Sequence, residues 1–87
     1  MKLIGKLVKD TKTVKAAVAE KRDDKADYRD LLEECFLKLC SDLDIPVPLW
    51  LKKNSKEFGA YRFTFFTADQ FLERIDFDRF EMRLEPD

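Results

Sequence analysis

One segment carries the pattern that most restricts the fold. Its apolar side chains recur at steps of three and four residues, which is the period of one face of an α-helix. These side chains are Tyr28, Leu31, Leu32, Cys35, Phe36, Leu39, Cys40 and Leu43. Asp23 and Asp24 are suitable N-cap residues, and Pro46 disfavours helical geometry at the residue before it. The pattern predicts a helix over residues 25–43, whose apolar stripe needs a second surface to cover it.

Strands are predicted at the two ends of the chain. Phe80, Met82 and Leu84 alternate with charged residues, which is typical of a strand with one buried and one wet face. Residues 2–8 and 13–20 are rich in Leu, Ile, Val and Thr, and a polar connection separates them. The sequence therefore predicts an N-terminal β-hairpin and a C-terminal strand.

Two shorter helices are predicted between these strands. Pro48 suits the first position of a helix, and the segment from there to Tyr61 has a largely helix-compatible composition. Thr67 and Gln70 match a capping box, which predicts a short helix over residues 68–74.

The length of the chain limits it to one domain. At 87 residues and 10.3 kDa it falls near the lower end of the usual range of domain sizes. Leu, Ile, Val and Phe make up roughly 30% of the residues, well above the ~20% below which chains tend to stay disordered. We expect a single α+β domain over residues 1–87: a small antiparallel sheet, made by the hairpin and the C-terminal strand, packed against one long and one or two short helices.

Charge is balanced overall but segregated along the chain. There are 17 basic and 18 acidic residues, for a formal net charge of −1, which excludes behaviour as a general polycation or polyanion. Residues 1–22 hold seven basic and two acidic groups, whereas residues 67–87 hold three basic and seven acidic groups. We expect the basic and acidic segments to lie side by side in the fold, because such neighbours need no external partner.

The sequence argues against an enzyme and against a bound metal or cofactor. No histidine is present, and histidine is the most common general acid, general base and metal ligand. Only Gly5 and Gly59 occur, so there is no glycine-rich phosphate loop. Cys35 and Cys40 are five residues apart on the predicted helix, too far for a disulfide. We expect both to be small buried apolar residues.

The chain is expected to be cytoplasmic and not to associate with a membrane. The first ten residues contain three lysines and no unbroken apolar run of the length that a secretory signal requires. The longest uncharged stretch, residues 45–51, contains two prolines and is far shorter than a membrane helix.

Three stretches carry a resemblance to known sequences. They are DIPVPLWLKKN at residues 44–54, DQF at residues 69–71 and FDRFE at residues 77–81. With them the chain resembles small uncharacterised proteins of Gram-positive bacteria, and the resemblance spans most of its length. It implies no activity, cofactor or partner.

The leading functional expectation is binding to a protein, including a second copy of the chain. Four aromatic residues occupy the six positions 61–66, and one buried face cannot hold them all. We expect surplus apolar surface near Leu49, Trp50 and Phe66, and such patches often mark interfaces. The open edge of the small sheet offers a second route to pairing, with a homodimer as one outcome.

Weak single-stranded nucleic acid binding is the alternative. Basic residues interleave with aromatic residues over positions 50–66, and such sites combine phosphate-binding cations with exposed rings. The basic residues are Lys52, Lys53, Lys56 and Arg62. If the stretch is helical, the lysines point away from Trp50, Phe58 and Tyr61, so we expect these rings to be core and the lysines a solvated face.

Overall fold

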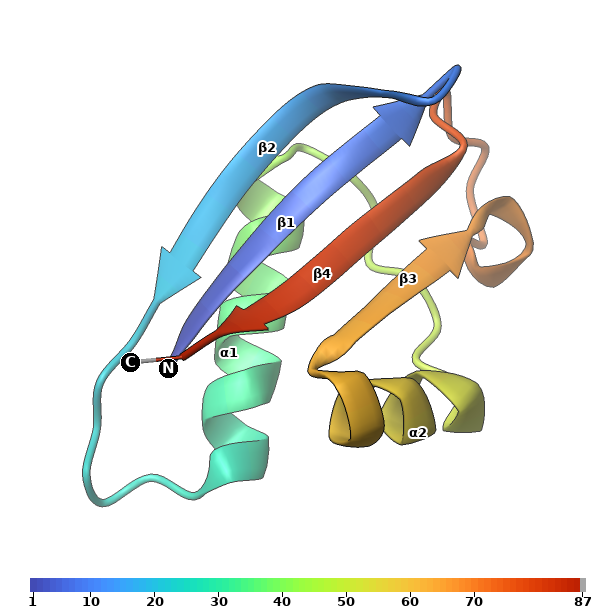
Figure 1. The fold of residues 1–87 in the computed structure, drawn as a ribbon. Helices are drawn as coiled ribbons and strands as arrows, with labels where there is room; N and C mark the ends of the chain where they lie inside the picture. Colours follow the sequence, from blue (N-terminus) through green and yellow to red (C-terminus); the bar gives the residue numbers. More distant parts are fainter. Residues whose placement is uncertain (87) are drawn as a thin grey trace.

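The computed structural model describes residues 1–86 (Figure 1). Four strands form one antiparallel sheet in the order β2-β1-β4-β3, so the predicted α+β class is confirmed. The elements are β1 (Lys2–Lys9), β2 (Lys12–Glu20), α1 (Tyr28–Asp42), α2 (Lys52–Tyr61), β3 (Phe63–Thr67), the 3₁₀ helix η1 (Ala68–Gln70) and β4 (Arg79–Glu85).

The predicted hairpin is confirmed as β1 and β2. Asp10 and Thr11 connect the two strands with φ values of 53° and 66°, which is the geometry of a two-residue turn that follows the natural twist of the strands. A β-bulge follows, because Leu7 pairs with Lys15 whereas Val8 pairs with Thr13. The bulge leaves one extra residue in β2 close to the turn.

The predicted C-terminal strand is β4, and β3 is an additional strand beside it. The sequence pattern left the segment before Thr67 open between a helical and an extended form. It is extended because Thr64 and Phe66 point to the covered face of the sheet, opposite Met82 and Phe80 of β4. The sheet therefore has one more strand than the predicted three.

Helix α1 covers one face of the sheet (Figure 1). Leu3 and Leu7 of β1 face it, with Gly5 between them. A Cβ at Gly5 would lie 3.0 Å from the Phe80 ring and 3.2 Å from Leu39 of α1, so the glycine allows the helix to approach the sheet closely. In the described part of the chain, no helix lies over the opposite face of the sheet.

The start of α1 differs from the prediction. Asp27 is the N-cap, and its Oδ1 accepts a hydrogen bond from the Asp30 amide at 2.9 Å. Asp23 instead accepts from the Lys25 amide at 3.0 Å and stabilises the turn before the helix. The expectation that Asp23 or Asp24 caps the helix is therefore wrong, since the chain needs these residues to cross from β2 to α1.

Helix α2 begins at Lys52 and not at Pro48. The Leu49 amide donates to the Gln70 carbonyl at 2.7 Å, which holds the segment after Pro48 extended and ties it to η1. Asn54 then accepts from the Leu51 amide at 2.9 Å and starts the helix.

The predicted short helix over residues 68–74 is only the single turn η1. The Thr67 amide donates to the Gln70 side chain at 3.2 Å, which is one half of the expected capping box. Beyond Gln70 the backbone turns extended at Phe71, whose ring is buried against Phe77. Burying that ring ends the helix early.

Candidate functional site

The three residues expected to form an apolar surface do not lie together on the surface. Phe66 is 0% exposed, and its ring centre lies 5.5 Å from the rings of Phe36, Trp50 and Phe80. The expectation that Phe66 faces outward is therefore wrong, because β3 turns it toward α1. Trp50 is half-buried, and only Leu49 is exposed.

Trp50 instead lines a hollow between α1 and α2. The hollow has a volume of about 540 Å³, and Leu32, Phe36 and Phe58 also line it. Ser55 also lines the hollow, and its Oγ accepts a hydrogen bond from the Trp50 indole N–H at 2.8 Å. Tyr28, Arg29 and Glu33 of α1 also line the hollow, so its wall is partly apolar and partly polar.

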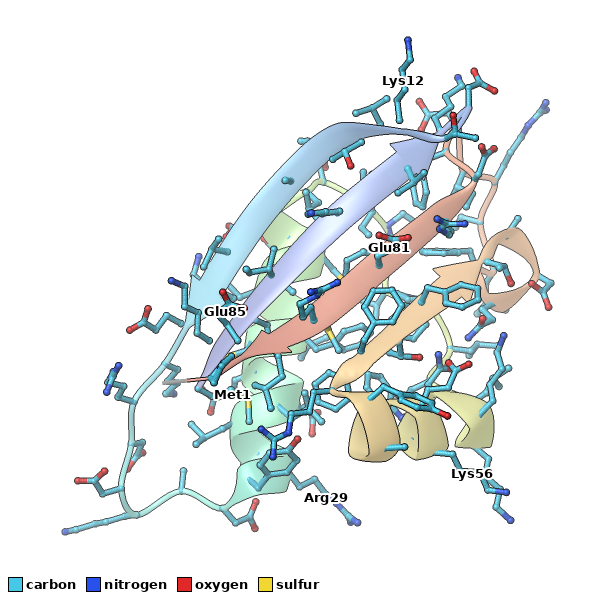
Figure 2. The ribbon with its side chains drawn as sticks, in the orientation of Figure 1. Met1, Lys12, Arg29, Lys56, Glu81 and Glu85 are labelled. Atoms are coloured by element: carbon cyan, nitrogen blue, oxygen red, sulfur yellow. The ribbon has the colours of Figure 1, made fainter. Side chains whose placement is uncertain are left out.

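The basic residues of the nucleic acid alternative are divided between two places. Lys52, Lys53 and Lys56 lie exposed on α2, while Arg62 ends that helix in a left-handed conformation with φ of 56°. Phe58 is buried and the α2 lysines are exposed, as predicted. The prediction that Tyr61 is also core is wrong: Tyr61 is 77% exposed, because it is the last residue of α2, where the chain turns into β3. Figure 2 shows Lys56 reaching into solvent from α2.

A different set of rings and cations meets on the open face of the sheet. Phe63 and Phe65 are half-buried there, 6.5 Å apart between ring centres. The Arg83 guanidinium lies 5.6 Å from the Phe63 ring centre, and Arg79 lies 5.8 Å from that of Phe65. Lys53 reaches round from α2 to within 5.5 Å of the Phe65 ring centre. In the sequence, the alternation of Phe63 and Phe65 with Thr64 and Phe66 indicates that the first two rings share one face of a strand.

Opposite charges alternate across the same face. Lys2 lies opposite Glu85 and Lys6 lies opposite Glu81 in the pairing of β1 with β4, where Figure 2 labels both glutamates. Glu81 also accepts from Arg79 at 2.7 Å. The expectation that basic N-terminal and acidic C-terminal segments lie side by side is confirmed.

One outer edge of the sheet, that of β3, is closed by a buried side chain. Asn54 of α2 is 0% exposed, and its Nδ2 donates to Thr64 Oγ1 at 2.8 Å and to the Phe65 carbonyl at 3.0 Å. The Gln70 side chain holds Asn54 in place by donating to Asn54 Oδ1 at 2.9 Å. The backbone carbonyl that β3 would offer to another strand is therefore already bound. No pattern in the sequence indicates this role for Asn54 and Gln70.

The other outer edge, that of β2, runs along the whole outside of the sheet (Figure 1). Val14 and Val18 are 58% and 50% exposed there. Met1 and Lys21 exchange two backbone hydrogen bonds, of 2.7 and 2.9 Å. In an antiparallel pair, hydrogen-bonded positions alternate with positions whose N–H and C=O groups point away from the partner strand. Counted from Lys21, Val18 and Ala16 are positions of the second kind, so their backbone groups point away from β1 and into solvent.

Lysine often protects an edge strand, but the lysine in the middle of β2 is turned under the sheet. Lys15 Nζ donates to the Leu43 carbonyl at 2.9 Å. Its positive charge there also interacts favourably with the negative end of the α1 dipole. Its ammonium group is therefore held on the covered face. We take the free edge of β2 as the candidate functional site.

Among residues 1–86 the structure shows neither a metal-ligand cluster nor an exposed cysteine. Within residues 1–86 no cluster of three or more His, Cys, Asp or Glu side chains could hold a metal ion. Cys35 and Cys40 are buried in α1, as predicted, and burial raises the pKa of the Cys40 thiol to about 12. A thiol with so high a pKa is a poor nucleophile at neutral pH.

Neither helix of residues 1–86 is long and apolar enough to cross a membrane. No protein-family model, curated protein or solved structure matches the chain. The geometry of its own surfaces therefore carries the functional argument.

Proposed function

We propose that the protein is a non-catalytic protein-binding module that accepts an extended strand of its partner along the free edge of β2. The observation that carries the proposal is the difference between the two edges of the sheet. Asn54 occupies the edge of β3, whereas β2 leaves its outward N–H and C=O groups and two valines in solvent.

Strand addition suits the chemistry of this edge. Backbone hydrogen bonds supply affinity in such complexes, and alternate side chains supply specificity. The middle of β2 carries Ala16, Ala17 and Ala19, so a second strand can approach its backbone without displacing large side chains. The exposed Val18 adds apolar surface that a partner would cover.

Capture experiments with matched variants test this proposal. A tagged form of the chain is incubated with nuclease-treated lysate to which an untagged copy of the same chain has been added. Val18→Lys places a charge on the edge and should abolish capture. Val47→Lys is the control, because Val47 is 49% exposed, nearly the same as Val18, but lies in the loop after α1.

A second variant tests the role of the backbone directly. Ala16→Pro removes an N–H that points away from β1, so it spares the β1–β2 ladder but should abolish capture. Thermal unfolding checks that each variant is folded. Equal capture by the wild type and both β2 variants, or no capture by the wild type, contradicts the proposal.

Single-stranded nucleic acid binding on the open sheet face is a second candidate function. Phe63 and Phe65 provide two neighbouring rings, with Arg79, Arg83 and Lys53 within 6 Å of a ring centre. This combination of stacking surfaces and phosphate-binding cations is the one that single strands require. The neighbouring glutamates make the expected binding weak.

Fluorescence anisotropy with a labelled single-stranded oligonucleotide tests the second candidate. Phe65→Leu should weaken binding more than Lys56→Gln, which removes a charge from α2 away from the rings. The log-log salt dependence should have a slope near roughly −2, for three phosphate contacts on a single strand. Equal effects of the two variants would remove the sheet face from consideration.

The proposed location is the cytoplasm. Cys35 and Cys40 are free and buried, which suits a compartment where thiols stay reduced.

A further inference from the structure

We infer that the strand added to β2 is β2 of a second copy of this chain, antiparallel to the first, with the two-fold axis passing beside Ala17. The inference rests on the proposed function and names its partner. It follows from the spacing of the outward backbone groups, from the side chains between them and from the charge at the two ends of β2.

The outward backbone groups of β2 are evenly spaced. Counting back from the bonded pair of Met1 and Lys21, the groups of Glu20, Val18 and Ala16 point away from β1. At the other end, the two-residue turn makes Lys9 and Lys12 a bonded pair, so the groups of Thr13 also point away.

The spacing stays regular across the β-bulge, although Thr13 and Ala16 are three residues apart. The four outward residues lie opposite alternate residues of β1, which are Val8, Lys6, Ile4 and Lys2. Successive positions are therefore about 6.8 Å apart along the strand. Without the bulge, Val14 would lie opposite Val8 and would replace Thr13 as the fourth outward residue.

One two-fold axis pairs all four outward positions with those of a second copy. An axis beside Ala17 places Ala16 opposite Val18 of the other copy, and Thr13 opposite Glu20 of the other copy. Moving the axis to Ala16 or Val18 leaves an outward position at one end without a partner. A two-fold interface must complement itself, and this register does so along the whole strand.

The side chains permit this approach. Ala17 meets Ala17 of the other copy on the covered face, while Val18 meets Ala16 on the open face. The Lys15 ammonium group is held at the Leu43 carbonyl of its own chain and does not stand between the strands. The exposed apolar surface of the two Val18 side chains is covered at the centre of the new sheet.

Charge at the strand ends is also complementary. The hairpin end of β2, residues 9–12, contains two lysines and one aspartate and carries a charge of +1. Residues 20–24 follow the other end and contain three acidic and two basic residues, for a charge of −1. Antiparallel pairing brings each +1 end beside the −1 end of the other copy, whereas parallel pairing would bring like charges together. Lys12 then lies opposite Lys21 of the other copy, whose ammonium group is already paired with Glu34.

Cysteine cross-linking tests the register. Thr13→Cys and Glu20→Cys are prepared as two separate proteins and oxidised mildly, alone and mixed. In the inferred dimer, residue 13 of one copy lies about 5.5 Å from residue 20 of the other between Cα atoms, within disulfide range. Each residue lies about 20 Å from its own counterpart, too far for a bond.

We expect a disulfide-linked dimer from the mixture and from neither protein alone. Ala17→Cys should cross-link alone, because paired positions at the axis are about 4.5 Å apart between Cα atoms. The oxidised wild type is the background control, since Cys35 and Cys40 are buried. No link in the mixture, or an equal link from Thr13→Cys alone, would overturn the inferred register.

Sedimentation equilibrium across a concentration range tests the dimer without cysteines. Val18→Lys should weaken dimerisation at least about tenfold, because each dimer then contains two lysines at the strand interface, while Val47→Lys should leave it unchanged. If Val18→Lys abolishes lysate capture but the wild type is monomeric, the partner is a different protein and only self-pairing fails. If capture is also independent of Val18, the proposed function fails as well.

Discussion

The replacement Asn54→Ala tests the closed edge of the sheet. Asn54 makes four hydrogen bonds, to the Leu51 amide, Thr64 Oγ1, the Phe65 carbonyl and the Gln70 side chain. A bond is worth about 1 kcal/mol net, and buried partners left without one add a further desolvation cost. We therefore expect the free energy of unfolding to fall by about 3–5 kcal/mol.

That loss is a large fraction of the total, since a domain of this length has a stability of roughly 4–13 kcal/mol. Urea unfolding followed by far-UV circular dichroism measures it, at low temperature if the variant is marginal. Lys56→Ala is the matched control on the same helix, because Lys56 is exposed and its replacement should change the stability by less than about 1 kcal/mol. An equally small loss for Asn54→Ala would show that the buried bonds do not hold α2 against β3.

The same replacement has a consequence for assembly. Without the amide, the Phe65 carbonyl is available to another strand, and both edges of the sheet are open. We expect the folded variant to form species larger than a dimer at high concentration, measured by light scattering. A variant that remains folded and assembles no further than the wild type would contradict the role of Asn54 in blocking strand addition at β3.

Three other predictions concern stability. Gly5→Ala should destabilise the protein by about 1–3 kcal/mol because its Cβ meets the packed ring of Phe80, whereas Gly59→Ala should stabilise it by about 0.5–1 kcal/mol because nothing lies within 4 Å; urea unfolding of both compares them. Burial raises the pKa of Cys40 from 9.0 to about 12, so the folded state favours the neutral thiol and stability should fall as the pH rises from 9 toward 12, and Cys40→Ala should reduce this dependence. Lys15→Met should lower the stability by about 1 kcal/mol by leaving the Leu43 carbonyl without its charged donor, and an equal loss at high salt and low salt would argue against an electrostatic part.

Helix α1 and strand β4 were predictable because each has an unambiguous period. The three-and-four repeat over α1 and the alternation over β4 each continue for several residues with one outcome. The segment 61–66 has no single hydrophobic period, because aromatic residues occur at both odd and even positions. Only the contact of Phe66 with Phe36 and Phe80, far away in sequence, decides that this segment is a strand and which of its faces is buried.

The candidate site was harder to predict than the fold. The sequence pattern predicts a hairpin and a distant strand in one sheet, but it does not decide whether the distant strand pairs with β1 or with β2. The strands at the two edges of the sheet therefore could not be predicted. The role of Asn54 depends on Gln70, sixteen residues away, and no local pattern relates a buried amide to an edge strand. The prediction of an exposed apolar patch near Trp50 and Phe66 was wrong for the same reason, because the burial of a ring depends on neighbours that are distant in sequence.

The two edges of this sheet are treated differently by the same chain, and that difference is the strongest argument for binding at β2. An exposed edge is a hazard that proteins blunt with charges, bulges or covering elements. At β3 the chain uses a buried asparagine held by a second buried amide. At β2 the ammonium group of the central lysine is bound to the Leu43 carbonyl on the covered side of the sheet, and the outward groups keep an even spacing across the bulge. A bulge and a lysine that could have protected the edge of β2 are thus arranged so that the edge stays regular and accessible, as a strand that pairs with another would require.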